Sequence, residues 1–247
     1  MTNRGCGLKS LFVGGFVLGL AVVAAQPAAA QSTIFNIPTT DTVAPKKGYF
    51  EFDYLLQAPA PDSGKFQIFT PRFVVGAGPK AEVGVNFANT HYSDDGGTYA
   101  QFQPNIKFKF YSNDDSGVAV AAGVIGYFGM NHDQDNFGMV YGLVSKKVKD
   151  GPRFHGGIYQ SMSYGDDEQT GAILGYEQPV SGKVSVVADW FSGKNFWGYF
   201  TPGVSITLPH SGLLNIGYSI GNNAYNDDPG NDTHNKAFFA YYGITFP

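Results

Sequence analysis

Apolar and polar residues alternate with a period of two along most of the chain after residue 46, and this feature limits the fold more than any other. The clearest case lies between residues 99 and 111, where one parity is almost entirely apolar. The other parity is polar throughout: Gln101, Gln103, Asn105, Lys107, Lys109. A strand places alternate side chains on opposite faces, whereas a helix would scatter the two lysines around its girth. We therefore expect strands with one apolar face.

Twelve segments show this alternation, each near the 9–11 residues or so that a tilted strand needs to cross a bilayer. They are 47–57, 66–76, 81–91, 99–111, 118–129, 137–148, 153–163, 170–178, 184–192, 197–208, 213–222 and 236–246. The pattern is blurred in 118–129 and 137–148, where glycine and alanine occupy both parities.

The connections between these segments also alternate in length. Tight turns follow the even segments, at 77–79, 112–117, 149–152, 180–183 and 209–212. Looser polar loops follow most odd segments, at 57–65, 91–98, 130–136 and 222–235. Outer-membrane barrels combine an even strand number with short periplasmic turns and longer external loops. The sequence therefore predicts an all-β protein, an antiparallel transmembrane β-barrel of about 12 strands spanning 47–247.

Charge follows the same division. The longer loops hold eleven of the 20 acidic residues: Asp62, Asp94, Asp95, Asp133, Asp135, Asp166, Asp167, Glu168, Asp227, Asp228, Asp232. Basic residues gather at the opposite rim: Lys46, Lys47, Lys80, Lys146, Lys147, Lys149, Arg153, Lys183. We expect an acidic external end and a basic periplasmic end. An acidic external entrance would favour cations at low salt, and screening by higher salt would weaken that preference.

Residues 1–30 have the order of a secretory signal peptide. Arg4 and Lys9 precede an apolar run over 11–25, and an A-x-A site precedes Gln31. The run is shorter than the 20 or so residues of a spanning helix. Cys6, the single cysteine, lies in this leader, so the mature chain has no disulfide. Residues 31–46 follow as a periplasmic segment on this topology, and the sequence leaves open whether they fold into the lumen as a partial plug.

Composition excludes several classes of protein. Charged residues make up 15% against a quarter or so in soluble domains, and 33 residues are glycine, which argues against a coiled coil. The net charge of −4 provides no basic stripe for nucleic acid. A secreted β-sandwich would also show alternating strands. The barrel is favoured because aromatic residues lie toward the strand ends, the opposite parity is polar, and the last strand ends in Phe246 before Pro247.

Two stretches resemble a family of small outer-membrane proteins named for the MetA pathway of phenol degradation. The first runs from Asn36 to Val43, continues with Pro45-Lys46-Lys47-Gly48 and leads into the first segment. The second comprises Gly175-Tyr176-Glu177-Gln178-Pro179, followed by Asp189-Trp190-Phe191-Ser192-Gly193 and Pro202-Gly203-Val204. The resemblance spans most of the mature chain. It implies an outer-membrane barrel that passes small molecules. It brings no catalytic residues with it, and the family name, which records a genetic context, is no basis for inferring a phenolic substrate.

The polar parity of each segment supplies the residues expected to line the lumen. They are Glu51, Asp53, Arg72, Glu82, Asn86, Gln101, Gln103, Asn105, Lys107, Lys109, Asp189, Asn215 and Ser219. Opposed carboxylates and cations could select solutes by charge. They could equally pair and close a narrow barrel, because eight strands are filled by their own side chains and sixteen or more leave a channel. Twelve strands lie between these cases, and both interpretations stay open.

We therefore predict a monomeric outer-membrane channel that passes small hydrophilic solutes by passive diffusion. Its expected partners are outer-membrane lipids, lipopolysaccharide and the solutes, with no nucleic acid and with no cofactor, metal or catalytic residue. A closed structural or adhesive barrel is the main alternative. A lipid hydrolase is a further one, with His155 as the strand histidine. The acidic loop 226–232 has enough oxygen ligands for Ca²⁺ but lacks EF-hand spacing.

Overall fold

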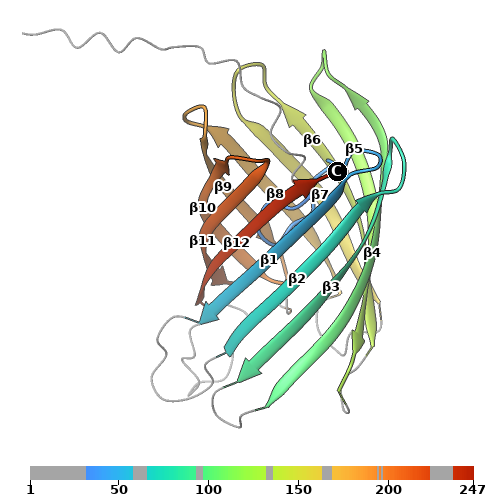
Figure 1. Ribbon diagram of the computed structural model, residues 1–247, viewed down its shortest axis with the longest axis vertical. Coiled ribbons are helices and arrows are strands. Elements are labelled where there is room, and N and C mark those ends of the chain that lie inside the picture. The colour runs from blue at the N-terminus through green and yellow to red at the C-terminus, as the bar shows by residue number, and fades with distance from the viewer. Residues whose placement is uncertain are drawn as a thin grey trace, which may run out of the picture.

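The computed structural model describes residues 32–57, 66–92, 97–131, 136–162, 169–193, 195, 197–222 and 236–247. In these ranges the chain forms twelve antiparallel strands that close into one barrel (Figure 1). The strands are β1 (Gly48–Gln57), β2 (Phe66–Gly76), β3 (Ala81–Tyr92), β4 (Thr98–Asn113), β5 (Val118–Gly129), β6 (Phe137–Lys147), β7 (Arg153–Met162), β8 (Thr170–Pro179), β9 (Val184–Phe191), β10 (Tyr199–Leu208), β11 (Gly212–Gly221) and β12 (Lys236–Phe246).

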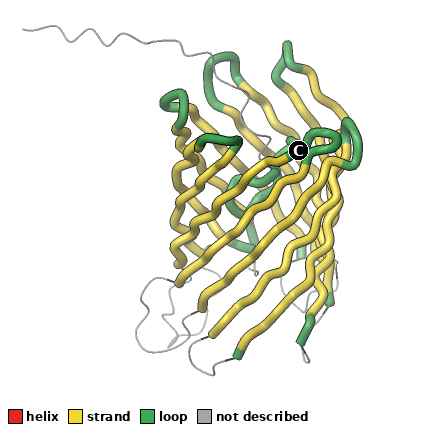
Figure 2. Tube along the Cα trace, in the orientation of Figure 1, coloured by secondary structure: helices red, strands yellow, loops and turns green. Residues whose placement is uncertain are grey.

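Pairing of the first and last strands closes the barrel. Partners run without a break from Gly48 opposite Phe246 to Gln57 opposite Ala237. One register shift interrupts the ladder between β4 and β5, between Lys109 and Tyr111. The described turns that follow the even strands gather at one rim, near the C-terminus (Figure 2). The predicted all-β, twelve-stranded antiparallel barrel is confirmed, and each predicted segment overlaps one strand. No helix in the described ranges is both long and apolar enough to span a bilayer.

The outer face of the barrel is a belt of exposed apolar side chains. Ile158 is 67% exposed and Phe110 is 56% exposed. The belt continues around the barrel with Phe52, Phe73, Val75, Ile106, Phe128, Val144, Phe154, Leu174, Val186, Phe200, Phe238 and Tyr242. A soluble monomer rarely exposes a contiguous apolar patch beyond a few hundred Å². A surface of this kind needs an apolar environment.

The inner face divides into two walls of different chemistry. The inward side chains of β1 to β4, called the polar wall below, are mostly charged or amide groups. The inward side chains of β5 to β9, called the apolar wall, include Tyr127, Met139, Leu143, Tyr159, Ile173 and Phe191, each at most 6% exposed. Here the interior differs from the polar lumen expected from the sequence. Alternation is blurred in β5 and β6 because both faces of these strands are apolar.

A loop after β9 extends the apolar wall at the end of the barrel where the odd strands finish. The Trp197 ring packs edge-on against Tyr127 and Phe137, with centroids 5.7 Å apart in both pairs. Its indole Nε1 donates to the Tyr127 hydroxyl at 3.2 Å. Asn195 donates to the Tyr159 hydroxyl at 2.6 Å. An aromatic cluster therefore fills this half of the barrel.

Residues 32–46, called the N-terminal segment below, lie inside the ring of strands (Figure 2). Ile34 and Ile37 are completely buried, and Phe35 is 4% exposed. Of the two placements that the sequence leaves open for this segment, the structure shows the one within the barrel. Residues 1–31, the eleven acidic loop residues and the loop 226–232 fall outside the described residues.

Candidate functional site: an occupied lumen

Four charged side chains from adjacent strands meet on the polar wall. Arg72 on β2 pairs with Glu51 on β1 at 3.2 Å, and Lys107 on β4 pairs with Glu82 on β3 at 2.9 Å. Glu51, Glu82 and Lys107 are at most 2% exposed. We call these four residues the charge cluster. Each charge has an opposite partner, as buried ions require.

The charge cluster holds the start of the N-terminal segment. The Ser32 hydroxyl donates to Glu82 Oε1 at 2.6 Å and accepts from Lys107 Nζ at 3.1 Å and Arg72 Nη2 at 3.2 Å. Lys107 Nζ also donates to the Ser32 carbonyl at 3.1 Å. Glu82 Oε2 accepts the Val43 backbone N–H at 2.7 Å. The cluster thus grips the segment at two places eleven residues apart in sequence.

Amide side chains form a hydrogen-bonded chain next to the charge cluster. Asn105 donates to Asn86 at 3.4 Å, Asn86 to Gln103 at 3.2 Å, and Gln103 to Gln101 at 3.1 Å. Gln103 is 8% exposed, whereas the other three amides are partly exposed. This part of the polar wall offers both donors and acceptors to whatever occupies the lumen.

Asp189 on β9 anchors the segment from the opposite side. Its Oδ2 accepts three consecutive backbone N–H groups, those of Phe35 at 3.0 Å, Asn36 at 2.5 Å and Ile37 at 2.9 Å. The Asn36 side chain donates to Thr201 Oγ1 at 2.9 Å. Asp189 is 1% exposed, and these N–H groups compensate the cost of burying its charge. One carboxylate therefore fixes a turn of the N-terminal segment.

Inward glycines let the apolar part of the segment approach the barrel backbone. A Cβ on Gly175 would lie 2.5 Å from Ile37 Cδ1 and 2.9 Å from Ile34 Cδ1. A Cβ on Gly217 would lie 2.6 Å from Phe35 Cζ. Nearby, Asn215 donates to the Ile34 carbonyl at 3.4 Å and to the Tyr241 hydroxyl at 2.6 Å. The segment is fitted to this side of the barrel by shape.

An ion pair between Arg153 and Asp41 links the segment to the barrel near the end of the segment that leads into β1. Arg153 on β7 donates to both carboxylate oxygens of Asp41, at 2.5 Å and 3.0 Å. The guanidinium also contacts Thr40 and Ser145, whose hydroxyls lie 2.6 Å apart. Burial acts to raise the pKa of Asp41, but the hydrogen bonds and charge of Arg153 outweigh it and hold the pKa below its usual 3.8. The pair is therefore charged near neutral pH.

The residues predicted to line the lumen all lie on inward faces, but the structure divides them into groups. Glu51, Arg72, Glu82 and Lys107 meet in the charge cluster, and the four amides form the chain beside it. Asp189 and Asn215 hold the segment from the other side, and Ser219 lies 2.8 Å from Thr201. Asp53 and Lys109 are partly exposed on β1 and β4. Whether these residues line a conducting pore stays a prediction.

The residues of the N-terminal segment that contact the barrel wall were not predicted from the sequence. Ser32, Thr33 and Asn36 carry no periodic signal because they precede the first strand. Arg153 and Asp41 were not recognised as partners, being 112 residues apart. The sequence did contain a hint that this segment is buried, in Pro38, Pro45 and the apolar pair Ile34-Phe35. An apolar patch has no obvious purpose in a segment exposed to water.

His155, the candidate for lipid hydrolysis, pairs with a carboxylate. Its Nε2 lies 2.6 Å from Glu177 Oε1 on β8. Ser145 is its cross-strand neighbour, but the Ser145 hydroxyl bonds to Thr40 and Arg153. Ser161 donates to the Gln169 carbonyl at 3.2 Å. Within the described ranges His155 Nδ1 has no hydrogen-bond partner, so no serine–histidine pair is formed.

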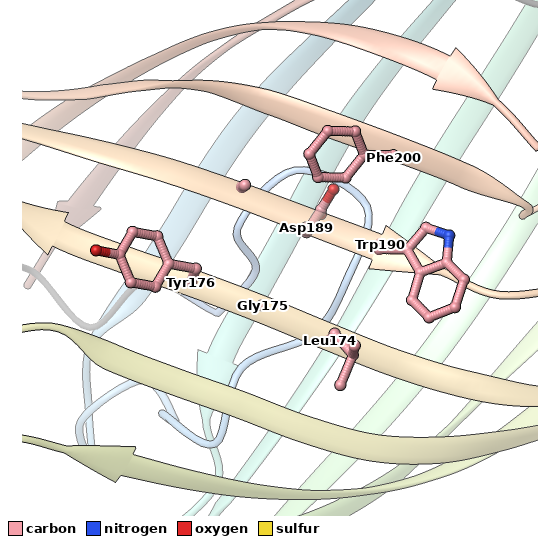
Figure 3. Close-up of a pocket in the computed structure, with 7 residues that line it drawn as sticks. Leu174, Gly175, Tyr176, Asp189, Trp190 and Phe200 are labelled. Carbon is pink, nitrogen blue, oxygen red and sulfur yellow. The ribbon is translucent and has the colours of Figure 1, made fainter.

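A shallow groove of about 360 Å³ lies over β8, β9 and β10 (Figure 3). Leu174, Tyr176, Trp190 and Phe200 surround a floor that includes Gly175 and Ala188. Asp189 belongs to the same stretch of wall, and its carboxylate reaches the N-terminal segment on the other side.

Comparisons with known proteins agree with this architecture. No protein-family model and no curated protein matches the chain. Among solved structures, an outer membrane channel from Pseudomonas putida F1 matches with a TM-score of 0.52 and 11% identity, covering 81% of this chain and 94% of that one. The likeness shows the fold. A structure from work on in-meso crystallization of membrane proteins matches with a TM-score of 0.43 and 11% identity, covering 81% of this chain and 83% of that one.

Proposed function

We propose that the protein is an outer-membrane channel that passes small hydrophilic solutes by passive diffusion and is closed at rest by its N-terminal segment. The exposed apolar belt and the closed hydrogen-bond ladder support placement across a bilayer, because hydrocarbon offers no partner for a free sheet edge. The solved structure of similar fold is described as an outer membrane channel. Outer-membrane lipids and lipopolysaccharide would surround the belt, and the protein would act as a monomer.

One observation carries this proposal: a separate segment, rather than strand side chains alone, fills the interior. Side chains fill a barrel of about eight strands, whereas twelve strands enclose more space. Here residues 32–43, which precede β1, occupy that space. The contacts that hold residues 32–43 involve side chains of the barrel and lie outside the strand-to-strand ladder, so these residues can leave without breaking that ladder. Their departure would expose the charge cluster, the amide chain and Asp189 to solutes.

A reversible tether tests the proposal. The Thr40 and Ser145 hydroxyls lie 2.6 Å apart, one on the segment and one on β6. The chain has a single cysteine, Cys6, in the predicted leader. Thr40→Cys with Ser145→Cys in the mature chain should therefore form one defined disulfide.

Conductance in planar lipid bilayers is the measurement. We expect the oxidised double variant to stay closed and to open in steps after reductant is added. Each single-cysteine variant, unable to cross-link, should give the same conductance with and without reductant. Steps that are equal in oxidised and reduced protein would show that the segment is not the gate. A correctly inserted wild-type barrel that never conducts would favour the closed structural barrel.

A further inference from the structure

The Ser32 hydroxyl sits between charges of both signs. It donates to the Glu82 carboxylate and accepts from the Lys107 ammonium and the Arg72 guanidinium, with oxygen-to-partner distances between 2.6 and 3.2 Å. Ser32 is completely buried. The polar wall therefore recognises this hydroxyl with one acceptor and two donors.

Thr33 repeats the arrangement at the neighbouring position. Its hydroxyl accepts from Arg72 Nη1 at 3.1 Å and donates to Glu51 Oε1 at 3.4 Å. Arg72 thus contacts both hydroxyls with different nitrogens. Two adjacent hydroxyls are held by two carboxylates and two cations.

Hydrogen-bonding capacity decides what chemistry fits this arrangement. A hydroxyl is both donor and acceptor, whereas a carboxylate only accepts and an ammonium group only donates. The charges of the four cluster residues also cancel, two against two. An uncharged group that donates and accepts at once can bond both to the carboxylates and to the cations of the cluster.

Further capacity remains beside the two hydroxyls. Among the described residues, Arg72 Nε and Asp53 Oδ1 have no hydrogen-bond partner, although both atoms are buried. One is a donor and the other an acceptor. Buried polar groups are normally satisfied, so these two atoms leave one donor and one acceptor available to a group of the same dual character, a solute hydroxyl or a water.

We propose that the charge cluster, together with Asp53, is a binding site for uncharged polyhydroxylated solutes of the monosaccharide class. The hydroxyls of Ser32 and Thr33 occupy it in the closed protein as internal stand-ins for such a solute. This assignment rests on the proposed channel function, because a solute reaches these residues only through the lumen. It predicts competition between solute and segment for the same partners.

Binding of D-glucose to the full mature chain in detergent micelles, measured by titration calorimetry, tests this without requiring conduction. Ser32→Ala with Thr33→Ala removes the competing hydroxyls, and we expect this variant to bind glucose about tenfold more tightly than the wild type, the equivalent of one hydrogen bond or so. Adding Glu82→Leu with Lys107→Met should abolish binding. Both charges of the pair are replaced so that neither is left buried alone.

Two controls and one substitute variant define the result. Lys183→Met removes a lysine from an exposed turn and should leave glucose binding unchanged. Tetraethylene glycol, a neutral chain of mainly ether oxygens, should bind far more weakly than glucose because ethers cannot donate. If the variant lacking Glu82 and Lys107 does not show the mobility of a folded barrel on a gel, Glu51→Leu with Arg72→Met replaces it.

The outcomes separate this proposal from the channel itself. Absence of glucose binding to the folded Ser32→Ala, Thr33→Ala variant would overturn the polyol site, as would equal binding of tetraethylene glycol or binding that survives loss of the cluster. Conductance steps would meanwhile still support the channel. Glucose binding as expected in a protein that never conducts would support the site and reject the channel.

Discussion

The polar wall on β1 to β4 and the apolar wall on β5 to β9 face the same lumen but bind the N-terminal segment through different kinds of interaction. The polar wall grips Ser32 and Val43 through paired charges and directed hydrogen bonds. Across the lumen, Ile34 and Ile37 pack against Gly175, and one carboxylate, Asp189, collects three backbone N–H groups. Directed bonds are lost when one partner changes, whereas packing yields gradually with volume.

The comparison also explains how a segment can be both secure and removable. The aromatic cluster around Trp197 joins strand to strand and loop to wall, so it stabilises the barrel itself. The hydrogen bonds from the charge cluster to Ser32, Thr33 and Val43 join barrel to segment, so these bonds stabilise the closed state. Changes in the aromatic cluster should alter unfolding, and changes at the contacts of the segment should alter gating.

Asp189→Ala should have the largest effect on gating. It leaves the N–H groups of Phe35, Asn36 and Ile37 without their acceptor, at about 1–3 kcal/mol for each buried donor. We expect the opening equilibrium to rise by about a hundredfold or more, seen as frequent conductance steps in planar bilayers. Asp189→Asn keeps one acceptor oxygen and should fall between this variant and the wild type. Equal gating in all three proteins would remove Asp189 from the mechanism.

Trp197→Ala should destabilise the barrel with little change in gating. Loss of a buried aromatic ring costs about 3–5 kcal/mol, and the Tyr127 hydroxyl loses its indole donor. The midpoint of urea unfolding, followed by gel mobility, should fall. Trp190→Ala, the change of the other tryptophan, removes a partly exposed side chain and should lower the midpoint less. A larger effect at Trp190 would contradict the assignment of the aromatic cluster to barrel stability.

Gly175→Ala tests the fit of the segment against the barrel backbone. The new methyl group would lie 2.5 Å from Ile37 Cδ1, and overpacking of this kind costs about 1–3 kcal/mol. We expect more frequent opening in bilayers with an unchanged unfolding midpoint, because the side chain of Ile37 can move away. Gly142→Ala on β6 is the matched control, since its methyl group would have no atom within 4 Å. Identical behaviour of the two variants would mean that the segment tolerates the added volume.

The closed barrel could be predicted from the sequence because strand periodicity is local: Lys107 and Lys109 share a parity whatever else the chain does. The inward direction of Glu51, Glu82 and Asp189 follows from the same rule. Their partners could not be predicted, because Ser32 and Asn36 belong to a segment without period, and contacts such as Asn36 with Asp189 span 153 residues. The apolar wall was missed for a related reason. Alternation shows which face differs from the other, and β5 and β6 have two similar faces.

Acidification should weaken the closed state by a smaller step than the loss of Asp189 or the crowding at Gly175. The pKa of Asp41 in the closed protein lies below its usual 3.8, so the pair with Arg153 stabilises that state fully above about pH 4. This contribution is lost as the pH falls through the lowered pKa, because protonated Asp41 no longer attracts the guanidinium. Side chains that are 19% and 27% exposed suggest a modest gain of about fivefold in opening. Bilayer recordings between pH 7 and pH 3 measure it, and Asp41→Asn should open more readily at neutral pH and lose this part of the pH dependence. If Asp41→Asn keeps the full wild-type response to acid, the carboxylates of the polar wall cause that response. The acid-sensitive contacts of the segment would then be those at Ser32 and Thr33 instead of the pair of Asp41 with Arg153.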